Sequence, residues 1–397
     1  MTSGERAGEE PRSRDGSPAT VPAAVRLAVQ RAATRVAPDQ RVTAFAVDAE
    51  TDGDVVVLTG VVGDARARRA VVDAVERAVP DRRVRHELAT LAGSGEAQTT
   101  ARRVVPVCGE PDADAEQVTQ ARYGTALQAY DRRGSWRRVR TPDGYLGWMD
   151  AEAIEEPGDP GGDWEADAVV TSPAEPAEAS DGLPERIPAG TPCRIEPTSG
   201  AATTGRAKTD DEATDGDGPP SGAATTDDEP TGRAGTTVSF RTGASAVLDA
   251  DVVRRRRPVG DGQRVVDAAT QFRGTPYEWG GTTITGIDCS GLVLIAYAVA
   301  GVRLPRDADQ QETLGVGVDR DALEPGDLLF WPGHVAISLG GDEFVHAYGD
   351  AEGVTVNSLD PDDDRYVADL DEGLRSTKRL LDRGAASANS ASGGDRE

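Results

Sequence analysis

Stretches that cannot pack into a core interrupt this chain and divide it into small units. Residues 199–235 contain no large aliphatic and no aromatic side chain, but they carry eight acidic and three basic residues. Such a segment cannot offset the entropy lost on ordering, so we expect a disordered acidic insertion there. Similar compositions predict disordered ends at 1–20 and 383–397 and a linker at 157–163. The 397 residues should therefore form several small domains rather than one core.

Acidic residues outnumber basic ones by 69 to 43, which gives a net charge of −26. This charge argues against nucleic acid and against an anionic membrane surface as partners, because both are bound through basic residues. Lysine is nearly absent, with only Lys208 and Lys378. An acidic, lysine-poor surface is typical of halophilic proteins, and codon bias is the alternative explanation.

The chain carries no targeting signal that we recognise. Its first 20 residues lack an apolar stretch, and no apolar run reaches the length of a membrane span. The three cysteines, Cys108, Cys193 and Cys289, are sparse and far apart, which favours a reducing compartment over a disulfide framework. We therefore expect a cytoplasmic monomer.

The first unit, residues 21–95, alternates between helical and strand periodicity and carries no catalytic constellation. It resembles a BON domain, a small α+β binding module, and a plain structural adaptor is the alternative. The expected elements are helices at 21–36 and 65–79 and strands at 42–47, 55–62 and 84–91.

The next two units have the texture of small β domains. Residues 104–155 combine short strands, turn glycines and the aromatic residues Trp136 and Trp148, a pattern that resembles a bacterial-type SH3 barrel. Residues 164–256 predict a second SH3-like barrel, interrupted by the acidic insertion. Cys193 lies in this second unit, where we interpret it as a small buried hydrophobe.

The last unit, 257–382, carries the chemistry. Its pattern predicts a helix, a glycine-rich loop, an apolar helix and then short strands, which is an α+β arrangement. The expected helices begin at Val265 and Ser290, and the expected strands are 328–331, 335–339 and 344–346.

Cys289 stands where the glycine-rich loop meets the apolar helix. A helix N-terminus carries partial positive charge, which we expect to lower the pKa of the thiol. His334 and His346 lie on two strands joined by a tight turn, so the hairpin can bring their rings together and supply a base and its orienting partner. The alternatives are a core thiol with satisfied histidines, or a zinc site, although the spacing lacks the pairs of structural zinc motifs.

Five ordered sequence blocks give this unit a specific resemblance. The strings PYEWGG–GIDCSGL, LPRDADQQ, LEPGDLLFW, GHVAISLG and FVHA, within 260–359, resemble the NlpC/P60 family of cysteine peptidases. The resemblance implies a papain-like α+β core and a catalytic triad of Cys289, His334 and His346, with Tyr277 and Ser290 beside the nucleophile. It implies no metal and no cofactor.

Together with the preceding SH3-like units, the arrangement is similar to cytoplasmic γ-D-glutamyl-L-diamino-acid endopeptidases. This similarity implies hydrolysis of γ-D-glutamyl amide bonds in short peptidoglycan-derived peptides, with Glu110, Tyr145 and Asp307 binding the free amine of an N-terminal L-alanine. Ala308 stands where that subfamily often has serine. The alternatives are a helix cap for Asp307 and a solvated charge for Glu110. For the whole chain, the alternatives are another amide hydrolase or acyltransferase on this scaffold, or a non-enzymatic protein that binds cell-wall fragments.

Overall fold

The structure is a computed structural model that describes residues 21–158, 164–197, 235–256 and 261–381. The expected disordered ends, most of the linker and the acidic insertion up to residue 234 lie outside these residues, and Gly235, the last residue of the expected insertion, begins a strand. The chain divides into two compact units, residues 1–95 and 96–397, each of which is described by itself. None of the described helices is both long enough and apolar enough to cross a membrane.

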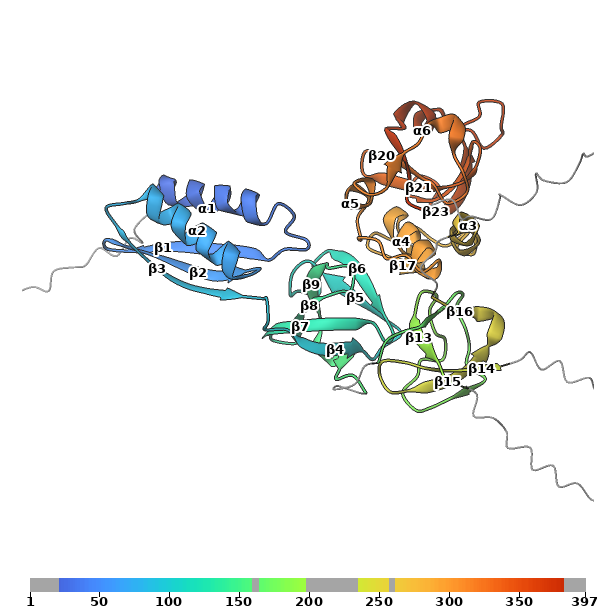
Figure 1. The fold of residues 1–397 in the computed structure, drawn as a ribbon, viewed down its shortest axis with the longest axis horizontal. Helices are drawn as coiled ribbons and strands as arrows, with labels where there is room; N and C mark the ends of the chain where they lie inside the picture. The colour runs from blue at the N-terminus through green and yellow to red at the C-terminus, as the bar shows by residue number, and fades with distance from the viewer. Residues whose placement is uncertain (1–20, 159–163, 198–234, 257–260, 382–397) are drawn as a thin grey trace, which may run out of the picture. The chain divides into compact units, whose positions relative to one another are not determined.

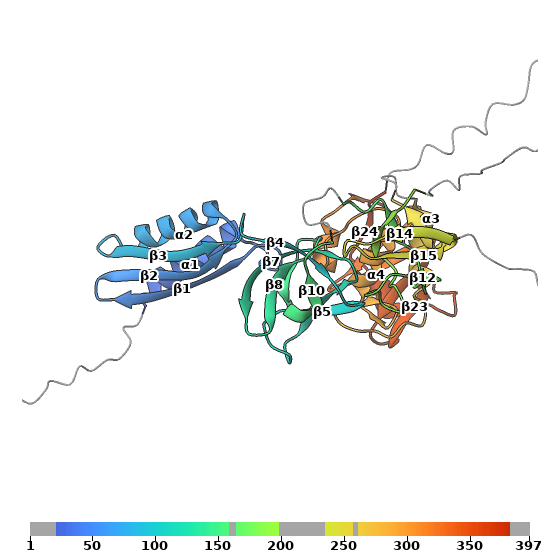
Figure 2. The same ribbon diagram turned by 90° about the horizontal axis from the view of Figure 1, so that it is seen from below.

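Residues 21–95 form a three-stranded sheet with both helices on one face (Figure 1, Figure 2). Strands β1 and β2 form an antiparallel hairpin, and β2 and β3 are parallel because α2 crosses over between them. Val25, Val56, Leu58, Val71 and Val75 are fully buried between helices and sheet. The elements are α1 (Ala23–Val36), β1 (Phe45–Asp52), β2 (Val55–Val62), α2 (Ala65–Ala78) and β3 (Arg83–Thr90).

The strand expected at 42–47 begins and ends later than its sequence suggested. Asp39 accepts hydrogen bonds from the backbone and side chain of Arg41, which holds the chain in a turn just before the strand. The strand then pairs with β2 along its full length, up to the turn at Gly53, whose φ of 59° favours glycine. The correct span of this strand is therefore 45–52.

Residues 96–155 form one seven-stranded sheet, in the order β10-β4-β7-β8-β9-β5-β6. The pairing is open, with β10 and β6 as the two edges of the described sheet, where we expected a closed barrel. Edge strand β6 is covered by a loop of the C-terminal domain instead, as described below. The strands are β4 (Glu96–Thr100), β5 (Val104–Cys108), β6 (Gln117–Arg122), β7 (Ala126–Arg133), β8 (Trp136–Arg140), β9 (Leu146–Asp150) and β10 (Ile154–Glu155).

The second β unit is also an open sheet, in the order β12-β15-β14-β13-β11-β16. Strands β13 and β14 pair with each other from opposite sides of the acidic insertion, as expected of a domain with a segment inserted into it. Its core contains Ile187, Cys193, Phe240 and Leu248. The strands are β11 (Ala168–Val170), β12 (Glu178–Ala179), β13 (Pro192–Ile195), β14 (Gly235–Ser239), β15 (Ser245–Asp249) and β16 (Val253–Arg255).

The C-terminal domain has the expected α+β arrangement, with an antiparallel sheet in the order β19-β24-β20-β21-β22-β23. Helices α3 and α4 pack on this sheet and share a core with it (Figure 1). The helices are α3 (Gly262–Thr270), α4 (Cys289–Val299), α5 (Ala308–Glu312) and α6 (Ala368–Gly373). The strands are β17 (Thr282–Thr283), β18 (Gly286–Ile287), β19 (Val316–Gly317), β20 (Leu328–Trp331), β21 (His334–Gly340), β22 (Glu343–Tyr348), β23 (Gly353–Ser358) and β24 (Ser376–Arg379).

Candidate active site

Cys289 is the first residue of helix α4, and the loop before it holds it in place. Asp288 caps the helix by accepting a hydrogen bond from the Gly291 N–H at 2.6 Å, and it also accepts one from the Gly280 N–H at 2.8 Å. Residue 291 must be glycine, because a Cβ there would stand 2.2 Å from the carbonyl oxygen of Gly281. The string Asp-Cys-Ser-Gly therefore fixes the position of the thiol through local geometry.

The thiol of Cys289 is buried, and its pKa differs from our expectation. Burial, together with the neighbouring carboxylate of Asp288, raises this pKa to about 11. The backbone N–H groups of Val335 and Ser290 act in the opposite direction without reversing the shift. The prediction of a lowered pKa was wrong because desolvation outweighs the helix N-terminus. Cys289 therefore needs a base to remove its proton.

The two predicted histidines meet inside the sheet. His334 begins β21, and His346 lies on β22, the next strand of the hairpin. The Nε2 atom of His334 lies 2.8 Å from Nδ1 of His346, and His346 is fully buried. Val335, which directly follows His334, directs its N–H to the Cys289 thiol. The structure thus pairs the two predicted histidines and places the start of strand β21 against the Cys289 thiol. The catalytic roles of the three residues stay a prediction.

A fourth residue, Asn357, extends this row and was missed in the sequence. Its Oδ1 lies 2.9 Å from Nε2 of His346, and its Nδ2 donates to the carbonyl of Arg365 at 2.9 Å. The contact with the Arg365 carbonyl fixes the orientation of the amide, so that Oδ1 faces the histidine as an acceptor. Asn357 lies on β23, and nothing in its own sequence context relates it to His346.

The orientation of Asn357 determines where each imidazole carries its proton. An amide oxygen only accepts, so His346 carries its proton on Nε2 and leaves Nδ1 as an acceptor. His334 then donates its Nε2 proton to that atom, and its Nδ1 keeps a lone pair. Burial lowers the pKa of His334 to about 3 and that of His346 to about 4. At neutral pH both rings are neutral, and His334 can accept a proton from a thiol.

Tyr277 lies close to Cys289 and Asp288, as predicted. Burial raises the pKa of its phenol to about 12, and the nearby Cys289 and Asp288 contribute to the shift. The phenol therefore stays protonated and can donate a hydrogen bond at the site. Its backbone N–H is held by the carbonyl of Glu352 at 3.0 Å.

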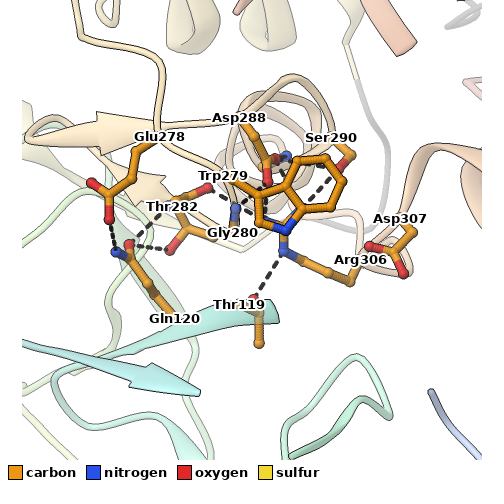
Figure 3. A network of polar contacts seen from close by, with 12 residues as sticks. Thr119, Gln120, Glu278, Trp279, Gly280, Thr282, Asp288, Ser290, Arg306 and Asp307 are labelled. Carbon is orange, nitrogen blue, oxygen red and sulfur yellow. Dashed lines mark hydrogen bonds and ion pairs between the residues drawn. The ribbon is translucent and has the colours of Figure 1, made fainter. Parts of the chain in front are cut away.

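The buried guanidinium of Arg306 links helix α4, which begins at Cys289, to the seven-stranded sheet of residues 96–155, called here the first β domain (Figure 3). It contacts both carboxylate oxygens of Asp288, at 2.6 and 3.0 Å, and donates to the hydroxyl of Ser290 at 2.8 Å. Its Nε donates to Thr119 on β6 at 2.9 Å. Burial alone lowers the pKa of Arg306, but Asp288 more than compensates and the pKa is raised. Arg306 was not predicted, although its sequence neighbour Asp307 was.

A second set of contacts fixes the glycine-rich loop against β6. Gln120 accepts the backbone N–H of Thr282 at 2.9 Å, and its amide reaches Glu278 at 3.3 Å (Figure 3). Gln117 donates to Glu278 at 3.1 Å and to the carbonyl of Trp279 at 2.9 Å. The edge of the first β domain therefore holds the loop that leads to Cys289.

The other four residues predicted to bind substrate differ from one another in their contacts and exposure. The hydroxyl of Ser290 is engaged by Arg306 and Asp288, which is a structural role. Asp307 is the N-cap of α5 and forms a capping box with Gln310, as in the alternative reading above. Tyr145 is buried just before β9, and Glu110 is exposed after β5. Contact of these four residues with a substrate stays a prediction.

No group of three or more histidine, cysteine, aspartate or glutamate side chains within the described ranges is placed to hold a metal ion. The three cysteines are all free and buried. The described residues of this domain therefore provide a buried thiol with a phenol close to it, and a row of two neutral imidazoles and an amide. This set can perform nucleophilic attack with general-base assistance.

Comparison with known families agrees with this chemistry. The NlpC/P60 family model matches residues 274–367, and the model of the bacterial dipeptidyl-peptidase SH3 domain matches residues 107–154. The chain therefore carries an NlpC/P60 domain, a cysteine-peptidase domain, preceded by a bacterial SH3 domain.

Individual relatives match about a quarter to a third of the chain. Dipeptidyl-peptidase 6 of Lysinibacillus sphaericus is 45% identical over 109 residues, which are 27% of this chain and 40% of the relative. The γ-D-glutamyl-L-lysine dipeptidyl-peptidase of Bacillus subtilis is 31% identical over 130 residues, or 31% of this chain and 44% of the relative. The matched region thus spans about two fifths of these curated relatives.

One solved structure matches a larger part of the chain. It is an NlpC/P60 family protein from Bacillus cereus, with a TM-score of 0.56 and 18% sequence identity. The match covers 72% of this chain and 100% of that chain. At this identity the likeness concerns the fold alone.

Proposed function

We propose that this chain is a cysteine peptidase that hydrolyses γ-D-glutamyl amide bonds in short peptidoglycan-derived peptides with a free N-terminal L-alanine. The observation that carries the proposal is the row Asn357–His346–His334 beside the buried thiol of Cys289. Two curated relatives that match part of this chain are named γ-D-glutamyl-L-lysine dipeptidyl-peptidases, which supports the substrate class.

In the proposed mechanism, His334 Nδ1 takes the proton of Cys289 as the sulfur attacks the amide carbonyl carbon. The backbone N–H of Cys289 and the phenol of Tyr277 stabilise the oxyanion. His334 then gives the proton to the leaving amine, and the C–N bond breaks to leave a thioester. Water attacks the thioester while His334 takes its proton, and the acid and the free thiol are released.

Recognition of a free amine is the finer part of the proposal. A carboxylate has more than one acceptor site, so Asp307 can cap α5 and still accept a bond from an ammonium group. Glu110 and Tyr145 of the first β domain would assist. A charge-assisted contact of this kind contributes about 1.5–3 kcal/mol, or roughly ten- to a hundredfold in rate constant over affinity.

The context of the chain is also part of the proposal. The net charge of −26 and the sparse cysteines support a cytoplasmic, salt-adapted monomer whose partner is a small peptide. The unit 21–95 would act as a BON-like binding module and 164–256 as a second SH3-like domain. A purely binding protein has no need of a thiol beside two neutral histidines, so we favour an enzyme.

The test is a panel of L-Ala-γ-D-Glu-diamino acid peptides, with free and acetylated N-termini, assayed in KCl. We expect the free peptides to be hydrolysed at the γ-glutamyl bond and Cys289→Ala to abolish turnover. Cys108→Ala, which removes another buried thiol, is the matched control and should keep activity. Turnover by Cys289→Ala would overturn the mechanism, and equal hydrolysis of acetylated peptides would overturn the free-amine recognition alone.

A further inference from the structure

A cavity of about 340 Å³ lies where three domains meet. These are the first β domain (residues 96–155), the second β domain (residues 164–256) and the C-terminal domain (residues 261–381). Strand β6, the turn between β14 and β15, and helix α4 with the loop after it all contribute to its wall. None of the predicted catalytic or substrate-binding residues lines it. Its residues include four arginines, Arg122, Arg241, Arg256 and Arg303.

Within the described ranges, none of the four arginines has a carboxylate at ion-pair distance, whereas Arg306 nearby is paired with Asp288. The charge of Asp143 does act on Arg122, and it raises the pKa of the guanidinium against the larger lowering by burial. The Nε atoms of Arg122 and Arg241 are buried and have no hydrogen-bond partner there. A buried, unpartnered donor is costly, so these groups are suited to a partner that the described residues do not supply.

The two carboxylates on the cavity wall offset only part of this charge. Asp143 already accepts hydrogen bonds from the hydroxyl of Thr141 and the backbone N–H of Tyr145. Glu165 is exposed. Four guanidinium groups and two carboxylates leave the cavity with an excess of two positive charges.

Like charges are also held close together here. Burial lowers the pKa of Arg256, and the positive charge of Arg303 lowers it further. Burial likewise lowers the pKa of Arg122, to about 10. In a chain with 26 excess negative charges, such a group of unpaired arginines runs against the overall composition.

The wall also has an apolar part. Leu294, Ala298 and Leu304 line one side, and the indole of Trp164 lies on the wall as well. The volume is that of a small-molecule site, at the lower end of the usual range of about 300–1,000 Å³. The cavity therefore fits a small molecule that has both an organic body and negative charge.

We propose that this cavity is a binding site for a small organic anion with at least two negative charges, such as a polycarboxylate or a phosphorylated metabolite. Planar guanidinium groups pair with carboxylates and phosphates through two parallel hydrogen bonds, which satisfies the unpartnered Nε atoms. The site is separate from Cys289, so the inference does not depend on the proposed peptidase activity.

The test is isothermal titration calorimetry on the full chain with inorganic phosphate, citrate and 3-phosphoglycerate, and with acetate as a monoanionic control. We expect citrate or 3-phosphoglycerate to bind saturably at one site per chain and acetate not to bind. Arg256→Gln should weaken binding about tenfold or more, because it removes a charge-assisted pair. Arg273→Gln, an exposed arginine of the same unit, is the matched control and should bind within about twofold of the wild type.

A stability measurement keeps the test informative if a variant loses binding. Without ligand, Arg256→Gln should unfold at the same or a higher urea concentration than the wild type, because it removes a repelled charge. Cys289→Ala should bind as the wild type does, which separates this site from the catalytic thiol. The proposal is overturned if none of the three polyanions binds below about 10 mM. It is equally overturned if only inorganic phosphate binds, or if Arg256→Gln and Arg273→Gln weaken binding alike.

Discussion

Replacing Asn357 tests whether the row of hydrogen bonds sets the protonation of the catalytic base. In Asn357→Leu, the Nε2–H of His346 loses its acceptor while remaining buried. His346 can then move its proton to Nδ1, where it opposes the Nε2–H of His334. To relieve that contact, His334 must move its own proton to Nδ1, the atom that should accept from Cys289.

The size of the effect follows from the lost acceptor. A buried donor without a partner costs about 1–3 kcal/mol, and each 1.4 kcal/mol changes an equilibrium tenfold. We therefore expect kcat of Asn357→Leu to fall about ten- to a hundredfold on a γ-D-glutamyl peptide, with KM nearly unchanged. The drop appears in kcat because Asn357 acts through the histidines and does not contact the substrate.

Asn357→Asp is the matched variant, because it also loses the bond to the Arg365 carbonyl but keeps an acceptor toward His346. Its kcat should stay within several-fold of the wild type. The added negative charge should raise the pKa of His346, so the acid limb of its pH–rate profile should move to higher pH. Equal kcat for the two variants, or wild-type kcat for Asn357→Leu, would refute this account of the base.

Two further predictions concern stability, and both use tryptophan fluorescence, because all five tryptophans lie in residues 96–397. His334 and His346 have pKa values of about 3 and about 4 when folded, below the ordinary value of 6.5, because burial disfavours the charged ring. Above about pH 6.5 both rings are neutral in the folded and the unfolded chain, so they impose no loss of stability. As the pH falls below about 6.5, the unfolded chain binds protons first, and the free energy of unfolding decreases by about 2 kcal/mol per histidine at about pH 5. The double variant His334→Gln/His346→Gln should flatten this dependence, and an unchanged slope would contradict it. Arg306→Met leaves the buried Asp288 carboxylate without its cation and should lower the free energy of unfolding in urea by about 3–5 kcal/mol. The control Arg102→Gln, at an exposed ion pair, should lower it by about 0–1 kcal/mol. Similar losses for the two variants would show that the buried pair is not the stabilising element.

The sequence could single out Cys289, His334 and His346 as candidates because the features that mark them are local. A capping aspartate, a cysteine and an apolar helix stand in one short string, and the structure has Asp288 capping α4 as that string suggests. The two histidines are joined by a single tight turn, so their approach follows from hairpin geometry. The helix and strands of this domain likewise appear within a few residues of their predicted positions.

The missed features depend on contacts between distant segments. Asn357 reaches His346 only because β23 pairs with β22 in one particular register, with Phe344 opposite Asn357. The pKa of Cys289 was misjudged for a related reason: the helix N-terminus is a local feature, whereas burial depends on tertiary packing. The open edge of the first sheet is also a tertiary property, since the glycine-rich loop that covers β6 comes from more than 150 residues later in the chain.

Arg306 and the half-buried Arg122 both lie at β6, but their guanidinium groups are satisfied to different degrees. Arg306 donates hydrogen bonds to Asp288, Ser290 and Thr119, and the carboxylate of Asp288 balances its charge. Arg122 donates to Thr282 at 3.2 Å, but its Nε is buried and unpartnered. Folding alone does not favour such a group, because an unsatisfied buried donor costs about 1–3 kcal/mol where an apolar side chain would cost nothing. The contrast between these two neighbouring guanidinium groups is therefore evidence that the cavity beside Arg122 is kept for an anion.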